Sequence, residues 1–337
     1  MQFVLLTGVT KFSQVSVFSG FNQPADISMV EDFDTLCGIT QEELEHYFAE
    51  PIAELARKYR QTVPGMMELL KRRYDGYHFS SRLVDVYNPF SLLNVFRYKA
   101  MKDYWFSTGT PTYLLRLLSH SDENLDELTG KYYGMEEFMD YKATVEKPLP
   151  MIYQSGYLTI KGYELDFGTF LLDFPNNEVK HGLVSLVAAN YLKADNSKMR
   201  SWLQELVLSM RQGDPEALRK LMTGFLAGIP YTMRWKEDER ERERYFHYTF
   251  YLIFNMVSIY TVYTEKEQSE GRVDCIVETD KYVYIFEFKL DGTAAEALAQ
   301  IEAKGYARPY EADARKLFRI GAVFSSQTGT ISDWAVE

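Results

Sequence analysis

The chain has 337 residues, 46% of them hydrophobic, and a formal net charge of −11. That length allows a sizeable core and two or three domains, while only two cysteines, Cys37 and Cys275, exclude a disulfide framework and a clustered thiolate metal site. Residues 1–10 lack the basic start and small-residue cleavage site of a signal peptide, and the longest apolar runs are too short for a membrane span. We therefore expect a cytoplasmic protein that does not span a membrane.

The first predicted element is a buried strand at residues 3–6, which runs into a polar turn at Thr7 and Gly8. Residues 41–71 predict helices, because acidic starts precede apolar positions at three-to-four spacing. Later, Asn88 followed by Pro89 predicts the start of a helix whose first turn contains the proline.

The pattern becomes typical of strands between residues 153 and 179. Residues 156–160 and 170–174 predict two strands, and Pro175-Asn176-Asn177-Glu178-Val179 should end the second strand and begin a helix. Residues 184–226 predict successive amphipathic helices. The charge run at residues 234–244 is the best candidate for a domain boundary, and its simplest interpretation is a solvated linker or helix face.

A helix and three strands are predicted after the charge run. The helix covers residues 245–260, and the strands cover residues 261–263, 272–277 and 282–290. A short turn at residues 278–281 joins the last two strands. These two strands carry the residues on which the functional prediction depends.

Three charged residues converge in this pair of strands. Glu287 and Lys289 are two apart in one strand, so their side chains point to the same face. If residues 279–280 form a two-residue turn, Asp274 lies opposite Ile285 and diagonal to Glu287, at about 7–8 Å. The two carboxylates could then share a metal ion, and a small set of oxygen ligands suits Mg²⁺ or Mn²⁺. Lys289 would orient the attacking water or offset charge on the phosphate.

A second Glu-x-Lys sequence, Glu302-Ala303-Lys304, tests this interpretation. It lies in residues 294–305, which predict a helix, and helical residues two apart point about 200° apart. Only the strand copy can therefore form a site. The alternative is that the three charges merely lie on a solvated strand face. That face also holds the apolar residues Ile276, Val283 and Ile285. Charges beside such a buried stripe need partners or a metal.

The same segment resembles a known superfamily. Gly271-Arg272-Val273-Asp274, Tyr282-Val283-Tyr284-Ile285-Phe286-Glu287-Phe288-Lys289, Ala297-Leu298-Ala299-Gln300-Ile301 and Lys304-Gly305-Tyr306-Ala307 resemble the PD-(D/E)XK nucleases. The resemblance runs to Trp334 and is strongest to the branch at the C-terminus of bacterial AAA-ATPase-like proteins. It implies an α-β-β-β-α-β restriction-endonuclease-like core at residues 233–337. In that core Asp274, Glu287 and the Phe288 carbonyl would bind Mg²⁺ or Mn²⁺, Lys289 would assist catalysis, and Gln300 would join from the following helix.

The superfamily often adds an acidic residue from its first helix, and Glu243 occupies a suitable place. Membership of the charge run explains Glu243 equally well. His247 lies four residues later on the same helical face, and we interpret it as a packed or rim histidine. Glu265 resembles an acidic position in this branch, without an assigned ligand role.

Motifs in the first two thirds resemble the rest of the same ATPase-nuclease architecture. The resemblance implies a mixed α/β chain, with a truncated AAA-ATPase-like region at residues 1–125 and a winged-helix-like and helical module at residues 126–232. The motifs are Leu6-Thr7-Gly8-Val9-Thr10-Lys11-Phe12-Ser13, Tyr74-Asp75-Gly76-Tyr77, Tyr87-Asn88-Pro89-Phe90-Ser91, Thr108-Gly109-Thr110-Pro111-Thr112, Gln154-Ser155-Gly156-Tyr157-Leu158-Thr159-Ile160 and Pro175-Asn176-Asn177-Glu178-Val179.

The sequence departs from an ATPase in one respect. It contains no Gly-x-x-x-x-Gly-Lys-Ser/Thr loop to cradle phosphates, so we do not expect ATP hydrolysis. A sheet without the preceding strands would leave residues 3–6 as an unpaired apolar edge. We expect rearranged helices, another copy of the chain or an ATPase partner to cover that edge.

Two functional classes follow from the sequence. The leading hypothesis is magnesium-dependent hydrolysis of nucleic acid, expected to be DNA, because the Asp, Glu and Lys of the site are all present. The alternative is a non-catalytic interaction or scaffold protein derived from an ATPase-nuclease. The missing phosphate loop favours the alternative, as does the acidic balance, since the chain from residue 231 onward has 14 Lys and Arg against 19 Asp and Glu.

Overall fold

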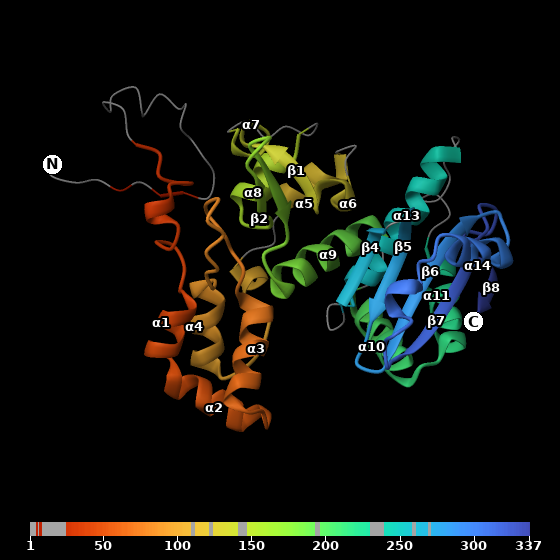
Figure 1. Ribbon diagram of the computed structural model, residues 1–337, viewed down its shortest axis with the longest axis horizontal. Helices are drawn as coiled ribbons and strands as arrows, with labels where there is room; N and C mark the ends of the chain where they lie inside the picture. The colour runs from red at the N-terminus through yellow and green to blue at the C-terminus, as the bar shows by residue number, and fades with distance from the viewer. Residues whose placement is uncertain are drawn as a thin grey trace. The chain divides into compact units, whose positions relative to one another are not determined.

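A computed structural model describes Leu5, Thr7, Gly8 and residues 25–108, 112–120, 124–140, 147–192, 196–229, 239–257, 261–268 and 271–337. Over these residues the chain is a mixed α/β protein with two sheets, and it divides into two units, Met1–Leu183 and Val184–Glu337 (Figure 1). Apart from Leu5, the strand predicted at residues 3–6 lies outside the described residues. The three domains expected from the sequence stay a prediction.

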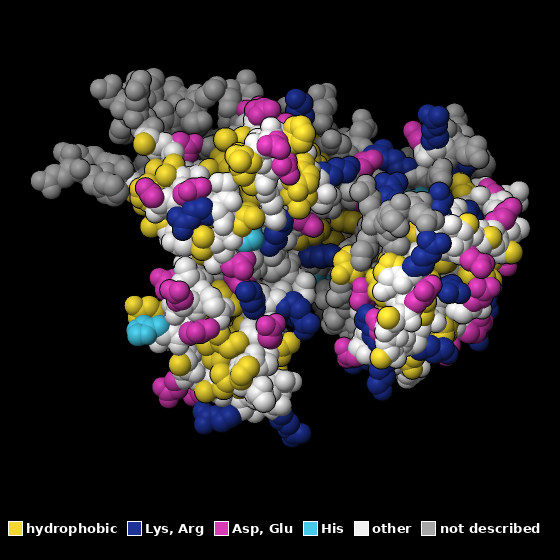
Figure 2. All heavy atoms as spheres, viewed as in Figure 1, with side chains coloured by type: hydrophobic (Ala, Val, Ile, Leu, Met, Phe, Trp, Pro, Cys, Tyr) yellow, Lys and Arg dark blue, Asp and Glu magenta, His cyan; other side chains and the backbone are white. Residues whose placement is uncertain are grey.

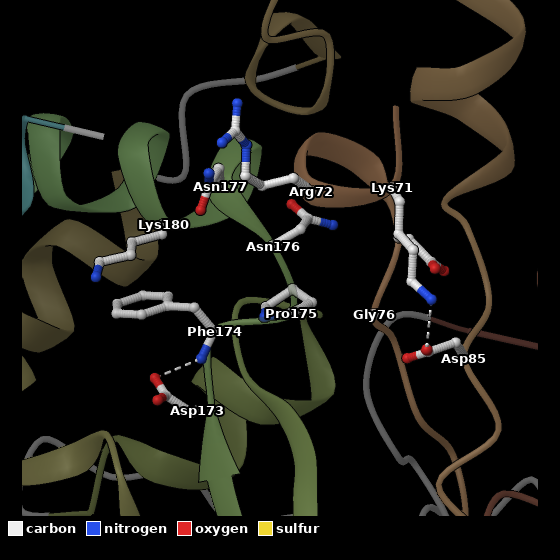
Figure 3. A pocket seen from close by; sticks show the side chains of 11 residues that line it. Lys71, Arg72, Gly76, Asp85, Asp173, Phe174, Pro175, Asn176, Asn177 and Lys180 are labelled. Atoms are coloured by element: carbon white, nitrogen blue, oxygen red, sulfur yellow. Dashed lines mark hydrogen bonds and ion pairs between the residues drawn. The ribbon is translucent and has the colours of Figure 1, made fainter. Parts of the chain in front are cut away.

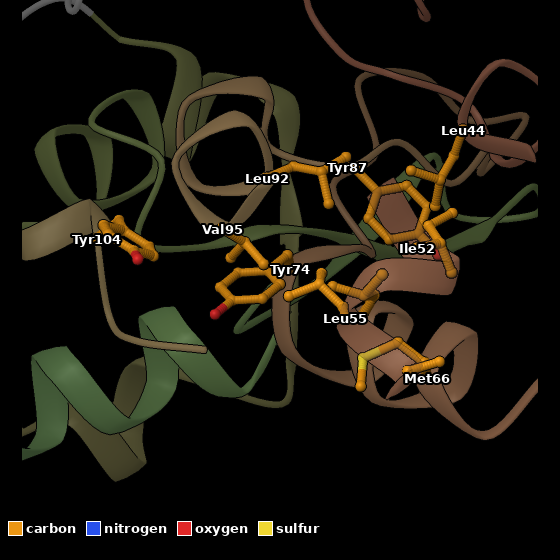
Figure 4. Close-up of a cluster of buried hydrophobic side chains, with 11 residues drawn as sticks. Leu44, Ile52, Leu55, Met66, Tyr74, Tyr87, Leu92, Val95 and Tyr104 are labelled. Carbon is orange, nitrogen blue, oxygen red and sulfur yellow. The ribbon is translucent and has the colours of Figure 1, made fainter. Parts of the chain in front are cut away.

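Helices at the start of the first unit pack around one buried cluster. Thr40, Thr62 and Asn88 cap three of them, each accepting a backbone N–H with its side chain. The cluster includes Leu55 and Tyr74 (Figure 4). The helices predicted within residues 41–71 are confirmed, and so is Pro89 in a first helical turn. The elements are η2 (Glu31–Phe33), α1 (Gln41–Tyr47), α2 (Ala49–Tyr59), α3 (Val63–Tyr74) and α4 (Pro89–Tyr98).

A small antiparallel sheet, in the order β1-β3-β2, follows in the same unit. β2 begins at Thr159, later than predicted, because Gly156 has a φ of 78° and closes the preceding helix. β3 ends at Asp173, one residue before the predicted end, and α9 begins at Asn177, within the segment predicted to start a helix. The elements are η3 (Trp105–Thr108), α5 (Thr112–His120), α6 (Leu125–Leu128), β1 (Lys131–Gly134), α7 (Met135–Met139), α8 (Leu149–Gln154), β2 (Thr159–Glu164), β3 (Thr169–Asp173) and α9 (Asn177–Tyr191).

The second unit is built on a sheet in the order β4-β5-β6-β7-β8. Among its described strands only β6 and β7 pair in parallel, and α14 is the crossover between them. The order α13-β4-β5-β6-α14-β7 is compatible with the expected nuclease-like core, whereas the winged-helix-like assignment of residues 126–232 stays a prediction. The elements are α10 (Asn196–Gln212), α11 (Pro215–Ala227), α13 (Glu239–Asn255), β4 (Thr261–Gln268), β5 (Gly271–Glu278), β6 (Tyr282–Leu290), α14 (Ala294–Ala303), η4 (Arg308–Tyr310), β7 (Lys316–Phe324) and β8 (Ile331–Val336).

Strand alternation assigns the two faces of this sheet to different helices. Phe288 of β6 stacks on Phe250 of α13, with ring centroids 4.3 Å apart. The next residue along β6 points the other way, and on that face Ile285 packs in a buried cluster with Ile301 of α14 and Tyr306. Glu287 and Lys289 alternate with Phe288, so they belong to the α14 face.

The turn between β5 and β6 corrects the predicted pairing. Thr279 donates its N–H to the Tyr282 carbonyl (2.9 Å) and accepts the Tyr282 N–H with its hydroxyl (2.9 Å), so the loop residues are 280–281 rather than 279–280. Ile276 accordingly pairs with Ile285. Continued by two residues, this register sets Asp274 across from Glu287, not across from Ile285. Moving a two-residue turn by one residue shifts the pairing by two, which preserves the face.

Two general surface properties complete the fold. Among the described helices, none combines the length and the apolar character needed to cross a bilayer. On the face of the second unit seen in Figure 2, basic and acidic side chains are interspersed over the described residues.

Candidate functional site

The structure brings four of the predicted site residues together on the α14 face of the second sheet. Asp274 comes from β5, Glu287 and Lys289 from β6, and Gln300 from α14. The Lys289 ammonium donates to Gln300 Oε1 at 2.6 Å and to Glu287 Oε1 at 3.2 Å. Residues of β6 and α14 therefore converge on one lysine.

Glu287 is the most deeply buried charged group of this site, with only 1% of the residue exposed. Its Oε1 accepts from Lys289, but its Oε2 is buried and has no hydrogen-bond partner of normal geometry among the described residues. Burial, and after it the Asp274 charge, raise the pKa of Glu287 to about 7, while Lys289 opposes the shift. A second positive charge beside Glu287 would satisfy the free oxygen and relieve this repulsion.

A hydrogen bond from the β6 backbone holds the side chain of Asp274. Its Oδ2 accepts the Phe288 N–H at 2.8 Å. In an extended strand the N–H and C=O of one residue point toward the same neighbouring strand, so the Phe288 carbonyl also faces β5. Two carboxylates and one carbonyl thus offer hard oxygen ligands, the donor type that Mg²⁺ and Mn²⁺ take. The described residues contain no group of three or more His, Cys, Asp or Glu side chains placed to hold a metal.

A glycine lets α14 approach the sheet closely enough for Gln300 to reach Lys289. Gly321 of β7 pairs with Glu287 of β6, and its missing Cβ would point toward α14. A Cβ atom on Gly321 would overlap the backbone oxygen of Ala294, at the start of α14, and would crowd Ala297. The absence of a side chain at this position therefore sets the distance between the helix and the strands.

Tyr306 belongs to this site, although its place in the sequence motif predicts no role for it. It is 1% exposed, its hydroxyl donates to the Arg272 carbonyl at 2.8 Å, and burial together with the Glu287 charge raises its pKa. Gly305, with a φ of 62°, ends α14 and turns Tyr306 back under the site. A glycine directly after a helix is the sequence signal that could have identified such an inward turn.

The remaining residues predicted from the sequence divide into two groups. Glu243 belongs to α13, which packs on the opposite face of the sheet, and its side chain lies outside the described residues, as does that of Glu265. Their assignments stay predictions. Glu302 and Lys304, by contrast, are exposed: Glu302 lies in the last turn of α14, and Lys304 is its C-cap with helical backbone angles, so the second Glu-x-Lys sequence has the predicted helical geometry.

Comparison with known proteins agrees with this geometry. Residues 241–334 match the model of the PD-(D/E)XK nuclease superfamily, so this segment is similar to proteins of that superfamily. Over 347 aligned residues the chain is 33% identical to an uncharacterized protein in the vnfD 5′ region of Azotobacter chroococcum mcd 1. The match covers all of this chain, which spans 63% of that protein's length. No solved structure matches the chain. The AAA-ATPase-like origin of the N-terminal part stays a prediction.

Proposed function

We propose that the C-terminal domain hydrolyses phosphodiester bonds of nucleic acid, expected to be DNA, with a bound Mg²⁺ or Mn²⁺. The superfamily match supports the reaction class. The observation that carries the site assignment is the buried, unpartnered Oε2 of Glu287, which lies beside Asp274 and the Phe288 backbone. A cation at this point would give the second oxygen of the Glu287 carboxylate a partner.

Each group of the chain has a distinct task in this proposal. Asp274, Glu287 and the Phe288 carbonyl hold the cation. When bound, the cation supplies positive charge that offsets charge on the scissile phosphate. Lys289 orients the attacking water with its ammonium group, and Gln300 positions that ammonium through the 2.6 Å hydrogen bond to its amide oxygen.

The test uses the two Glu-x-Lys sequences against each other. Lys289→Ala and Asp274→Ala should each lower metal-dependent nicking or exonuclease activity by about 100-fold or more, since both remove groups that act on the reacting phosphate. Lys304→Ala removes the same charge from the exposed helical copy and should keep full activity. Equal cleavage by the parent chain and all three variants would overturn the assignment.

The non-catalytic alternative makes a different prediction for the same proteins. A scaffold that retains the superfamily fold without a working site shows no cleavage in Mg²⁺ or Mn²⁺ and no dependence on Lys289. A parent chain that binds the metal but does not cleave nucleic acid would favour this alternative. Lys289→Ala, which leaves both carboxylates in place, should then bind the metal as the parent chain does.

A further inference from the structure

A polar pocket in the first unit has no role in the proposed phosphodiesterase. Its volume is about 340 Å³, and it lies between the end of α3 and the β3–α9 connection (Figure 3). These two segments contain sequence motifs, Tyr74-Asp75-Gly76-Tyr77 and Pro175-Asn176-Asn177-Glu178-Val179, for which the nuclease site has no use.

A partly buried lysine holds the two segments together. Lys161 of β2 donates to the Gly76 carbonyl at 2.5 Å and to the Pro175 carbonyl at 3.0 Å. Gly76 has a φ of 94°, and a Cβ atom there would overlap the Pro175 carbonyl oxygen. The walls of the pocket are therefore fixed by contacts that tolerate only glycine at this point.

Two side chains that line the pocket have buried polar atoms without hydrogen-bond partners among the described residues. Asp75 is 2% exposed, and neither of its carboxylate oxygens has a partner of normal geometry among the described residues. Asn176 is 8% exposed; its Oδ1 accepts the Val179 N–H at 3.1 Å and caps α9, which leaves Nδ2 without an acceptor among those residues. Buried polar atoms are nearly always paired, so these three atoms point to a ligand.

The charges around the pocket add a place for an anion. Lys71 is already paired with Asp85 at 3.5 Å. Arg72 also lines the pocket and makes no ion pair within the described part of the chain. Burial raises the pKa of Asp75 to about 6, so its carboxyl group is largely ionised at neutral pH and requires donors.

The unpartnered atoms define a hydrogen-bonding pattern. Asp75 offers two acceptor oxygens, and Asn176 offers an amide donor. A ligand that satisfies all three atoms presents two neighbouring donors to Asp75 and one acceptor to Asn176. The Watson–Crick edge of guanine has this order, N2–H, N1–H and then O6. Adenine and cytosine each present one amino group beside acceptors, so they leave one oxygen of Asp75 unsatisfied.

We propose that this pocket binds a guanine nucleotide. The base donates N1–H and N2–H to Asp75 and accepts from Asn176 at O6, while the phosphate lies against Arg72. The assignment rests on the first unit alone and does not depend on the proposed phosphodiesterase. The guanine is either a free nucleotide or a residue of single-stranded nucleic acid, since both present the same edge.

Calorimetric titration of the full chain with nucleoside monophosphates tests the base assignment. GMP should bind, IMP, which lacks the N2 amino group, should bind roughly tenfold more weakly, and AMP and CMP should bind more weakly still. Short single strands with and without one guanine identify the source: a guanine preference in the strands alone assigns it to nucleic acid, and one in GMP alone to the free nucleotide. No guanine preference in either series overturns the proposal.

A single substitution separates recognition from folding. Asp75→Asn replaces one acceptor oxygen by a donor, so it should invert the preference from GMP to XMP, whose base has a carbonyl oxygen in place of the N2 amino group. Asp85→Asn changes a carboxylate that already has partners and should keep the GMP preference. Arg72→Gln should weaken GMP and leave guanosine unchanged. An Asp75→Asn protein that unfolds, together with a parent chain indifferent to the base, would assign Asp75 a structural role.

Discussion

At the scale of single residues, the burial of Glu287 makes the stability of the fold depend on pH. Its pKa rises from an ordinary 4.5 to about 7. Between these values the folded chain keeps a proton that the unfolded chain releases, so this contribution to stability is complete below about pH 4.5 and declines as the pH rises to about 7. The metal-free protein should lose on the order of 2 kcal/mol of unfolding free energy from this group between pH 5 and 8.

Denaturant unfolding in EDTA at the two pH values measures this loss. Glu287→Gln has no charge to titrate, so its stability should decrease less than that of the parent chain over the same interval. The difference between the two proteins isolates Glu287 from other titrating groups, including Asp75. Identical decreases in both would contradict the raised pKa of Glu287.

The same residue predicts a response to metal. A ligand that binds only the folded chain raises its stability, by about 2.7 kcal/mol at a concentration 100 times the dissociation constant. Millimolar Mg²⁺ or Mn²⁺ should therefore raise the melting temperature of the parent chain. Asp274→Asn and Glu287→Gln should abolish the shift, and Lys304→Ala should retain it. A parent chain that does not respond to either metal would argue against the metal site.

At the scale of elements, the contact between α14 and β7 decides whether Gln300 reaches Lys289. Gly321→Ala adds a methyl group against the Ala294 backbone oxygen, which cannot rotate away. We expect a loss of about 1–3 kcal/mol in unfolding free energy and a lower cleavage rate at saturating substrate, because the helix must move outward.

Gly224 provides the matched control for this substitution. It lies within α11, and a Cβ atom there meets nothing within 4 Å. Gly224→Ala should therefore be neutral or stabilising, by up to about 1 kcal/mol, because alanine favours a helix over glycine. Urea denaturation of both variants checks the pair, and equal effects would show that the approach of α14 is not limiting.

At the scale of the whole molecule, charge limits how the chain can hold a polyanion. The net charge is −11, and basic and acidic side chains are interspersed on the visible face of the second unit (Figure 2). We expect only a few phosphates to be neutralised on binding, so the logarithm of the association constant should fall with the logarithm of salt concentration with a slope of about −3 or shallower. Fluorescence anisotropy with Ca²⁺ in place of Mg²⁺ measures it. A steep slope would require a basic surface that the composition does not suggest.

Local periodicity was sufficient for a large part of the prediction. Alternation along one strand assigned Glu287 and Lys289 to a common face, and the helical period excluded Glu302 and Lys304. Caps and breakers such as Asn88 with Pro89 located helix ends to within a few residues. These features depend on neighbours in the chain, so the sequence by itself determines them.

Tertiary structure decided which residues pair across strands and which side chains meet between elements. The hydroxyl of Thr279 closes the loop at residues 280–281, so Ile285 pairs with Ile276, and the same register continued sets Asp274 across from Glu287. The side-chain hydrogen bond from Lys289 to Gln300 exists because Gly321 admits α14. In the first unit, Asp75 and Asn176 share a pocket because Lys161 joins two distant segments. Such contacts depend on packing between elements, where one methyl group or one turn residue changes the outcome, and no local pattern encodes them.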